Sequence, residues 1–506
     1  MKRKGIQMKN DKIIIFDEPN LEFRYGQQTR DPRDGLSLFG PYDADTSSKP
    51  SLNYVVLGTE NGINTFNTWA EHMNQPITDA PKDNLRLWPP FPGFHVAFTQ
   101  KFPEEPVWSF PIPDEALLKA SRRSDPYQRS FEVVEKYLEG LQIASNRDEN
   151  IGVAICVVPE DVWKNCRPKS TVADVSGEKV SRKRLERRKS GQMEIFTDVN
   201  FDQYELSRDF RRQLKARAME YGIPIQIIRE TTLKLNDEHK LGERGLTPLS
   251  DRMWNLSTTI YYKCGGRPWK LVTAREGVCY IGIAFRKVES KNETASCAAQ
   301  MFLNTGDGIV FLGEYGPWFS PRERQFHLSK EASKELLTGV LETYRQQEGK
   351  ELTEIFLHSR SDISAEEFKG YQEACPAGVK LVGIRVRQDP LNNPRLYRLG
   401  DMPVFRGTFW KMSDRTGFLW GSGFAPRPAT YRGWDVPVPM RIDIQHGEAL
   451  IERVAHDIFG LTKLNYNACQ LGDSEPVTVG FSDAVGEILI SNPRVEKTRP
   501  NFKFYI

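Results

Sequence analysis

The pattern of apolar and polar positions predicts an α/β protein whose character changes near residue 278. In the first part, the uninterrupted apolar run 151–158 is typical of a strand buried on both faces of a parallel sheet. Apolar residues at helical spacing predict a helix over 126–143. The other elements expected in this part are strands at 11–17 and 53–58, a loop and strand at 222–228, and helices at 61–74, 203–221 and 251–263.

From residue 278 onward, three apolar strands follow in quick succession. The expected elements are strands at 278–286, 297–303 and 308–313, a helix at 329–347, a strand at 353–358, a helix at 364–373 and a strand at 378–386. Three consecutive strands followed by alternating helices and strands is the order of a ribonuclease-H-like sheet, although the order is not specific to it. Further strands at 404–423 and 440–445 and a helix at 447–459 are expected after it.

Composition is that of a folded protein with several domains. A length of 506 residues favours two to four domains, and 39% apolar with 27% charged residues excludes a disordered chain. Net charge is only +3, from 70 basic and 67 acidic residues, so any nucleic-acid site must come from local clustering. The strongest basic run, 179–189, is either a solvated loop or a contact for a nucleic-acid backbone.

The cysteines and the N-terminus indicate a cytoplasmic protein. The seven cysteines form no CxxC pair and no zinc-site spacing, which favours reduced, buried thiols. The apolar run Ile13–Phe16 is far too short for a signal peptide or a membrane span. We therefore expect no association with a membrane.

Four polar residues form a candidate phosphate site. A terminal phosphate carries nearly two negative charges, so its site needs several converging cations or donors. Arg211 and Lys215 are four residues apart and share one face of the predicted helix, Gln226 lies on the returning segment, and Lys263 ends the next helix. Each also has an ordinary explanation: a solvent-exposed i,i+4 pair, a strand residue, and a cation favoured by the helix dipole.

Several stretches resemble one protein family. The segments 210–218, 222–233 and 262–271, with 18–23, 31–36 and 39–41 near the start, resemble the short prokaryotic Argonautes, which consist of MID and PIWI domains only. The resemblance extends from residue 13 to 506. It implies a Rossmann-like MID domain with an N-terminal extension at 1–250, followed by a ribonuclease-H-like PIWI domain at 251–506.

The resemblance implies a role for the candidate phosphate site. The MID pocket of that family holds the 5′-phosphate of a short guide strand, and Lys215, Gln226 and Lys263 match its pocket residues. Arg211 stands where the family usually has a tyrosine, a histidine or another donor, and Thr259 is expected to face the same site. We expect Lys263→Glu to weaken guide binding severely and to leave folding nearly intact.

A metal is also implied. In prokaryotic members a divalent ion, here Mg²⁺, bridges the guide phosphate to the C-terminal carboxylate, which in this chain is that of Ile506. The alternative for this apolar tail is a terminal strand that only packs.

The resemblance also implies a cleavage site that lacks its acidic metal ligands. Two-metal cleavage needs acidic residues that hold two ions about 4 Å apart. Ala284 stands where a cleaving member has its first aspartate, and the segment after strand 353–358 offers only Asp362, which cannot hold two ions alone. The remaining candidates are expected to be surface, paired or structural residues; they are Glu314, Asp483, His327 and His358.

These expectations combine into one functional hypothesis with two alternatives. The resemblance implies a non-cleaving subunit that uses a guide RNA to recognise complementary single-stranded DNA. It also implies a heterodimer with an APAZ-containing effector, either a sirtuin-like or TIR NADase or sometimes a nuclease. An NADase partner would deplete NAD(P)⁺ in defence against plasmids or phage, and the complex would assemble further on activation. The alternatives are a nucleic-acid-guided endonuclease with atypical metal ligands and an interaction scaffold that binds no guide.

Overall fold

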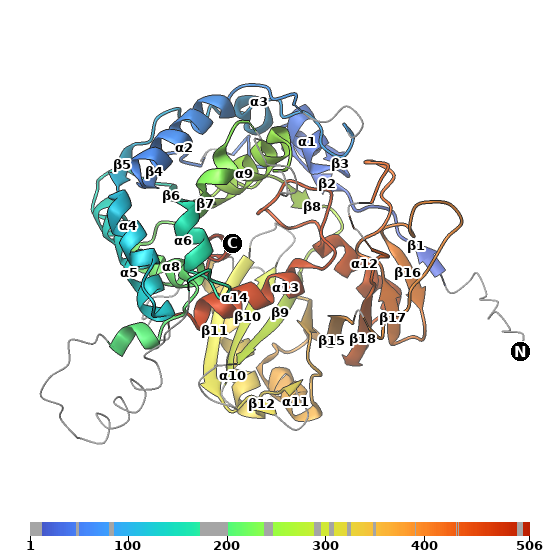
Figure 1. Ribbon diagram of the computed structural model, residues 1–506. Helices are drawn as coiled ribbons and strands as arrows, with labels where there is room; N and C mark the ends of the chain where they lie inside the picture. Colours follow the sequence, from blue (N-terminus) through green and yellow to red (C-terminus); the bar gives the residue numbers. More distant parts are fainter. Residues whose placement is uncertain are drawn as a thin grey trace, which may run out of the picture.

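The architecture is built around two β-sheets with helices on both faces of each (Figure 1). The computed structural model describes residues 13–46, 50–79, 85–172, 201–236, 246–287, 295–302, 308–320, 325–347, 351–389, 391–431, 433, 435–492 and 499–506.

The first sheet has four strands, all parallel. Its order is β5-β4-β6-β7, and the strands span Trp108–Pro111, Tyr54–Gly58, Val153–Val158 and Ile225–Arg229. Every residue of β4 and β6 is buried, as expected for central strands that are covered on both faces. The strand predicted from the apolar run 151–158 is therefore confirmed as β6.

Helices cover both faces of this parallel sheet (Figure 1). One face carries α4, α5 and α8, which span Asp114–Ser121, Pro126–Ser145 and Phe210–Ala218. The other carries α2 (Glu60–Met73) and α9 (Leu249–Lys263). α5 begins as predicted because the Asp125 side chain accepts hydrogen bonds from the main-chain N–H groups of Tyr127 and Gln128.

The second sheet has nine strands in the order β1-β16-β17-β18-β15-β14-β9-β10-β11. β9, β10 and β11 form an antiparallel meander, and β14 and β15 add in parallel beside β9. These strands span Val278–Lys287, Ala295–Phe302, Gly308–Gly316, Glu354–Ser359 and Lys380–Gln388. The predicted order of three strands, helix, strand, helix and strand is confirmed.

The rest of this sheet is antiparallel. The predicted strand region 404–423 contains a hairpin of β16 (Thr408–Lys411) and β17 (Thr416–Leu419), and β18 (Met440–His446) pairs with both β17 and β15. β1 (Ile13–Ile15) pairs with β16 and forms one edge of the sheet.

Helices also cover the second sheet on both faces. α10 (Lys330–Gln347) and α11 (Ala365–Ala374) pack on one face. The opposite face carries α12, α13 and α14, which span Ile451–Leu461, Val477–Gly480 and Ser482–Leu489. α13 lies directly on β9, because a Cβ atom on Gly282 would come within 1.9 Å of the Thr478 main-chain oxygen. The sequence pattern did not predict α13 or α14.

The N-terminal segment joins strands of the later sequence. β1 belongs to the nine-stranded sheet, and β2 (Leu21–Glu22) pairs with β8 (Lys270–Leu271) in a small sheet that also contains β3 (Gln28–Thr29). The division at residue 250 stays a prediction, and these pairings show that the chain crosses between its two halves more than once.

The helix predicted at 203–221 is shorter, because the Asp209 side chain caps α8 at Phe210 and Gly222 follows the last turn with a φ of 71°. Among the described cysteines, those at 156, 166, 264, 279 and 469 are buried and free, as expected, and Cys375 is half-buried.

Candidate functional site

Two lysines meet the end of the chain between α8, β7 and α9. Lys215 lies on α8, and its Nζ donates a hydrogen bond to the main-chain oxygen of Tyr505 over 3.2 Å. Lys263 is the last residue of α9, and its Nζ donates to the main-chain oxygen of Ile225 over 2.7 Å and to that of Ile506. The structure therefore brings these two predicted site residues to one place.

The position of Lys263 follows from the way α9 ends. Gly265 has a φ of 96°, a left-handed conformation that favours glycine. Its N–H donates to the Tyr262 oxygen over 2.9 Å, and the N–H of Gly266 donates to the Tyr261 oxygen over 3.0 Å. This is the Schellman arrangement, and it confirms the glycine stop expected after residue 263.

Burial raises the free-energy cost of charging both ammonium groups. The side chain of Lys263 is completely buried, and burial, followed by the neighbouring charge of Lys215, holds its pKa well below the ordinary value. Burial and then the charge of Arg211 lower the pKa of Lys215 to about 7. Among the described residues, the carboxyl group at this place is the terminal one of Ile506, which accepts from Lys263, and neither lysine has a carboxylate side chain as partner. One terminal carboxylate balances only one of the two ammonium groups, so a further anion placed beside them would stabilise the pair.

The burial of Lys263 changes one expectation from the sequence. Lys263→Glu would place a carboxylate against the main-chain oxygen of Ile225 and the terminal carboxyl group of Ile506, which offer it no hydrogen-bond donor. An uncompensated buried charge costs about 3–5 kcal/mol. This variant should consequently lose stability as well as phosphate binding, so Lys215, which is only half-buried, is the better residue for testing the site.

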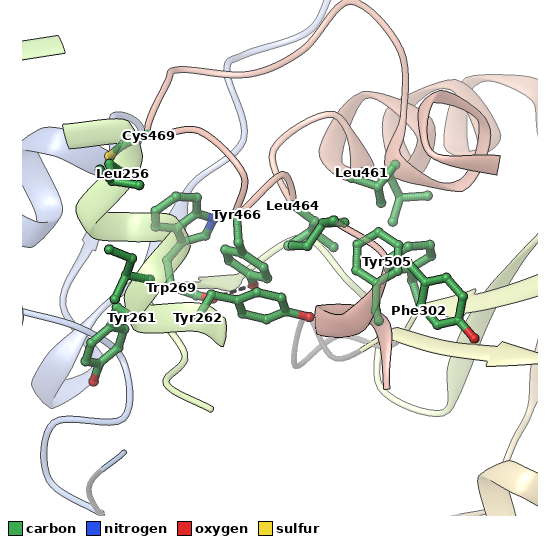
Figure 2. Close-up of a cluster of buried hydrophobic side chains, with 14 of the residues drawn as sticks. Leu256, Tyr261, Tyr262, Trp269, Phe302, Leu461, Leu464, Tyr466, Cys469 and Tyr505 are labelled. Atoms are coloured by element: carbon green, nitrogen blue, oxygen red, sulfur yellow. Dashed lines mark hydrogen bonds between the residues drawn. The ribbon is translucent and has the colours of Figure 1, made fainter. Parts of the chain in front are cut away.

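The tail that receives both lysines is fixed in the hydrophobic core. Phe502, Tyr505 and Ile506 are buried, and the ring of Phe502 meets that of Phe302 edge-on at 5.2 Å. Figure 2 shows Tyr505 in the same buried cluster as Phe302 and Tyr262. The segment Phe502–Phe504 forms a 3₁₀ turn, η7, rather than the terminal strand considered from the sequence.

Arg211 points to a different neighbour. It lies one turn before Lys215 on α8, and its guanidinium carbon is 5.1 Å from the centroid of the Trp163 ring. Burial lowers the pKa of Arg211, Asp209 raises it in part, and the charge of Arg167 lowers it further. The structure thus places Arg211 beside the lysine pair but directs it toward a second cluster of cations.

Gln226 and Thr259 occupy the elements that hold the lysine pair. Gln226 follows Ile225 on β7, and its amide lies 3.4 Å from the Ile227 main-chain oxygen, a long hydrogen bond. Thr259 is buried, and its hydroxyl donates to the Asn255 oxygen over 2.9 Å within α9. Gln226 therefore has donor capacity to offer a ligand, whereas Thr259 would first have to give up its helix bond.

The predicted cleavage position lies on the other sheet. Ala284 is 3% exposed on the face of β9 that α13 and α14 cover. Asp362 forms an ion pair with Arg385 and accepts a hydrogen bond from Gln445 Nε2 over 2.6 Å. Within the described ranges, no group of three or more His, Cys, Asp or Glu residues is placed to hold a metal. Loss of cleavage nevertheless stays a prediction.

The remaining candidates add little chemistry. His358 is buried, and its Nδ1 lies 2.8 Å from the hydroxyl of Thr478. Burial lowers its pKa to about 3, so the ring is neutral near pH 7, in keeping with the structural role expected for it. The basic run 179–189 and the side chains of Glu314 and Asp483 lie outside the described residues.

Solved structures with the same arrangement identify the fold. One is Clostridium butyricum Argonaute bound to a guide DNA and a 19-mer target DNA, with a TM-score of 0.56, 14% identity and coverage of 96% of this chain and 54% of that chain. The chain has an Argonaute-like fold. Aa-Ago with externally bound siRNA matches with a TM-score of 0.53, 15% identity and coverage of 97% and 56%. The A. aeolicus Argonaute crystal structure matches with 0.52, 15%, 96% and 53%.

The Argonaute-like fold rests on structure rather than on sequence similarity. The chain spans about half the length of the solved Argonautes that it matches. No protein-family model and no curated protein matches the sequence. In the described part of the chain, no helix has the length and apolar character needed to cross a bilayer.

Proposed function

We propose that this protein binds the 5′-phosphate of a guide strand at Lys215 and Lys263 and recognises a complementary strand by base pairing. The observation that carries the proposal is the convergence of these two desolvated lysines, with only the terminal carboxyl group of Ile506 to balance them among the described residues, in an Argonaute-like fold. A terminal phosphate supplies the missing negative charge and several acceptor oxygens. Gln226 adds a donor close by, and Thr259 joins it if its hydroxyl turns from Asn255. Arg211 lies one turn before Lys215 on α8 and would have to turn from the Trp163 ring to reach the same phosphate.

Fixing the 5′ end gives the guide a defined starting point. Contacts to phosphate groups orient a strand without reading its sequence, so sequence is read by pairing with the target. We propose an RNA guide and a single-stranded DNA target, as the resemblance to short prokaryotic Argonautes implies. In the matched C. butyricum structure both strands are DNA, and the Aa-Ago structure carries an siRNA.

The two sheets suggest a division of labour. We assign the four-stranded parallel sheet to a Rossmann-like MID domain and the nine-stranded sheet to a ribonuclease-H-like PIWI domain. We further propose that the PIWI part does not cleave. Ala284 has no carboxylate to offer, and Asp362 is neutralised by Arg385.

Binding of Mg²⁺ beside Ile506 would require a bound guide strand. Its proposed protein ligand is the Ile506 carboxylate, yet an oxygen of Ile506 already accepts a hydrogen bond from Lys263. Lys215 donates to the adjacent residue, so two ammonium groups surround the position. A divalent cation is repelled there unless phosphate oxygens also bind it. We therefore propose Mg²⁺ only for the state in which a phosphorylated guide is bound, where it would bridge Ile506 and the phosphate.

A recognition subunit without cleavage activity needs a partner to produce an effect. We propose the APAZ-containing NADase, sirtuin-like or TIR, that the resemblance implies, bound as a heterodimer that assembles further when a target is recognised. Coexpression with the product of a neighbouring reading frame tests this. A stable complex whose NAD(P)⁺ consumption depends on both guide and target is the expected result.

The nucleic acid that copurifies with the protein tests the central proposal. Short strands with a 5′-phosphate are expected, and a preparation that carries none and binds none would favour the interaction scaffold. The endonuclease alternative is tested by incubating labelled target with guide, protein and Mg²⁺ or Mn²⁺. A defined cleavage product would contradict the non-cleaving assignment.

A further inference from the structure

Five side chains from five neighbouring strands form a row across one face of the nine-stranded sheet. The row crosses β1, β16, β17, β18 and β15, and its members lie directly opposite one another in the order Ile13, Trp410, Phe418, Arg441 and Arg387. Directly opposite residues of antiparallel strands point to the same face of a sheet. This set, the Trp410 row, is therefore apolar at one end and cationic at the other.

The helical layer on this face of the sheet ends before the row does. α10 and α11 pack over the strands as far as β15, whereas α12 packs on β16 and β17 from the opposite face. Figure 1 shows β16, β17 and β18 to the right of α10 and α11. The residues that alternate with the row are completely buried; they are Phe409, Leu419, Met440, Ile442 and Val386.

The side chains of the row remain half-exposed. The rings of Trp410 and Phe418 lie side by side, with their centroids 5.9 Å apart. Aromatic side chains of this size contribute much binding free energy when a second molecule covers them. An uncovered apolar surface beside charged groups is typical of an interaction site.

The cationic end of the row has too little negative charge around it. Arg385 pairs with Asp362, and Arg441 pairs with Asp443 over 2.9 Å. The Arg387 guanidinium has no carboxylate partner in the described part of the chain, and its Nε has no hydrogen bond. Because Arg387 lies directly opposite Arg441, the two like charges destabilise this end of the row. A carboxylate from another molecule would relieve that repulsion.

The loop that follows β15 adds apolar surface at the same end of these strands. Leu391, Tyr397 and Leu399 are 92%, 76% and 101% exposed, the three highest values for large apolar side chains in the described ranges. Asn393 Nδ2 donates a hydrogen bond to the main-chain oxygen of Pro439 over 2.8 Å and so fixes the loop beside the start of β18. A loop that is already ordered loses less entropy when a partner binds.

The composition of this surface favours a protein over a nucleic acid. A nucleic-acid backbone requires several free cations along its path, but among the described side chains of the row only one guanidinium lacks a carboxylate. Tryptophan, other aromatic residues and arginine are the residue types enriched at the centres of protein interfaces.

We propose that the Trp410 row is the docking surface for the partner subunit. The segment that binds there presents apolar side chains to Ile13, Trp410 and Phe418 and a carboxylate to Arg387. The assignment rests on the proposed function, which supplies the partner, and it adds the place where that partner binds.

Cross-linking within the coexpressed complex tests this assignment. The full chain with Phe418→p-benzoylphenylalanine is coexpressed with the product of the neighbouring reading frame and illuminated. The two subunits should become joined, and the cross-linked peptide of the partner should contain Asp or Glu close to apolar residues. Trp108→p-benzoylphenylalanine is the matched control, because Trp108 is a half-buried aromatic residue beside Arg147 on the four-stranded sheet, and it should give no such product.

Two substitutions measure how much the row contributes. Trp410→Ala should raise the Kd of the complex about 30-fold, the effect of a typical hot-spot residue. Arg387→Glu should raise it about 10-fold or more, because a carboxylate then meets the carboxylate of the partner. This variant should fold normally, since its new carboxylate lies opposite Arg441. Both variants should keep the wild-type preference for a 5′-phosphorylated strand, and the control Arg147→Glu should leave the Kd of the complex unchanged.

Failure of this inference is distinguishable from failure of the proposed function. A complex that forms as tightly with folded Arg387→Glu as with wild type would overturn the docking surface and leave the partner and the guide site intact. A cross-link from position 418 to a guide or target strand, or to a second copy of this chain, would also overturn it. A wild-type protein that binds guide but forms no complex with the coexpressed product would overturn both the partner and its docking surface.

Discussion

Replacing Lys215 by methionine should remove most of the preference for a 5′-phosphorylated strand. Methionine keeps an unbranched apolar side chain in the half-buried space on α8 but lacks the ammonium group. A hydrogen bond to a charged group contributes about 1.5–3 kcal/mol, which corresponds to a factor of about 10–150 in Kd. Because burial already lowers the pKa of Lys215 to about 7, removing its charge should leave the fold at least as stable.

The dependence on pH gives this prediction a second signature. Only the protonated ammonium attracts phosphate, and burial lowers the pKa of Lys215 to about 7 in the free protein. The affinity of wild type for a phosphorylated strand should consequently fall as pH rises above 7, by up to about 10-fold per unit. The variant has no group to titrate at this position and should show a flatter profile over the same range.

The assay is a cycle of four Kd values: wild type and Lys215→Met, each with a 5′-phosphorylated and a 5′-hydroxyl strand of one sequence. Arg217→Gln serves as the matched control, because Arg217 is on the same helix and pairs with Glu135 instead of the tail. The control should keep the wild-type ratio. A ratio in Lys215→Met equal to that of wild type would refute the reasoning.

Three further predictions concern cleavage and stability. Ala284→Asp should create no cleavage activity with Mg²⁺ or Mn²⁺, and cleavage by this variant would show that the other metal ligands are present. The same change should lower the free energy of unfolding by about 2 kcal/mol or more, because the carboxylate would be buried on β9. Glu18→Gln should cost about 3–5 kcal/mol near pH 7, since it leaves the buried cations of Arg406 and Lys463 without their carboxylate. Burial alone would raise the pKa of Glu18, but these two charges outweigh it and lower the pKa. The stabilisation is therefore present above the unfolded pKa and lost as pH falls through the folded pKa. Wild type and Glu18→Gln should consequently approach the same free energy of unfolding in acid, and a difference that persists there would argue against this. Burial raises the pKa of Glu367 to about 7, so wild type should lose stability as pH rises from about 4.5 to about 7. At pH 8.5 Glu367→Gln should be about 2 kcal/mol more stable than wild type, and equal stabilities there would contradict this.

The elements with strong local signals could be predicted from the sequence. The apolar run of β6 has no polar position to face solvent, and the stop of α9 follows from the glycines at 265 and 266. The order of strands and helices from β9 to β15 was equally accessible, because each element carries its own hydrophobic period.

The rest depends on contacts between distant parts of the chain. Nothing local indicates that the side chain of Lys215 meets the main chain 290 residues later, or that β1 pairs with β16. The shared helix face of Arg211 and Lys215 was predicted from their spacing, but the approach of Arg211 to Trp163 depends on the packing of α6 (Glu160–Asn165) against α8. The short helices α13 and α14 contain too few turns to show a clear period.

A structure of the protein loaded with a 5′-phosphorylated guide and its complementary target tests the central claim most directly. The terminal phosphate should lie within hydrogen-bond distance of the Nζ atoms of Lys215 and Lys263, next to Ile506. A terminal phosphate in solvent, or bound on the nine-stranded sheet away from α8 and α9, would contradict the account.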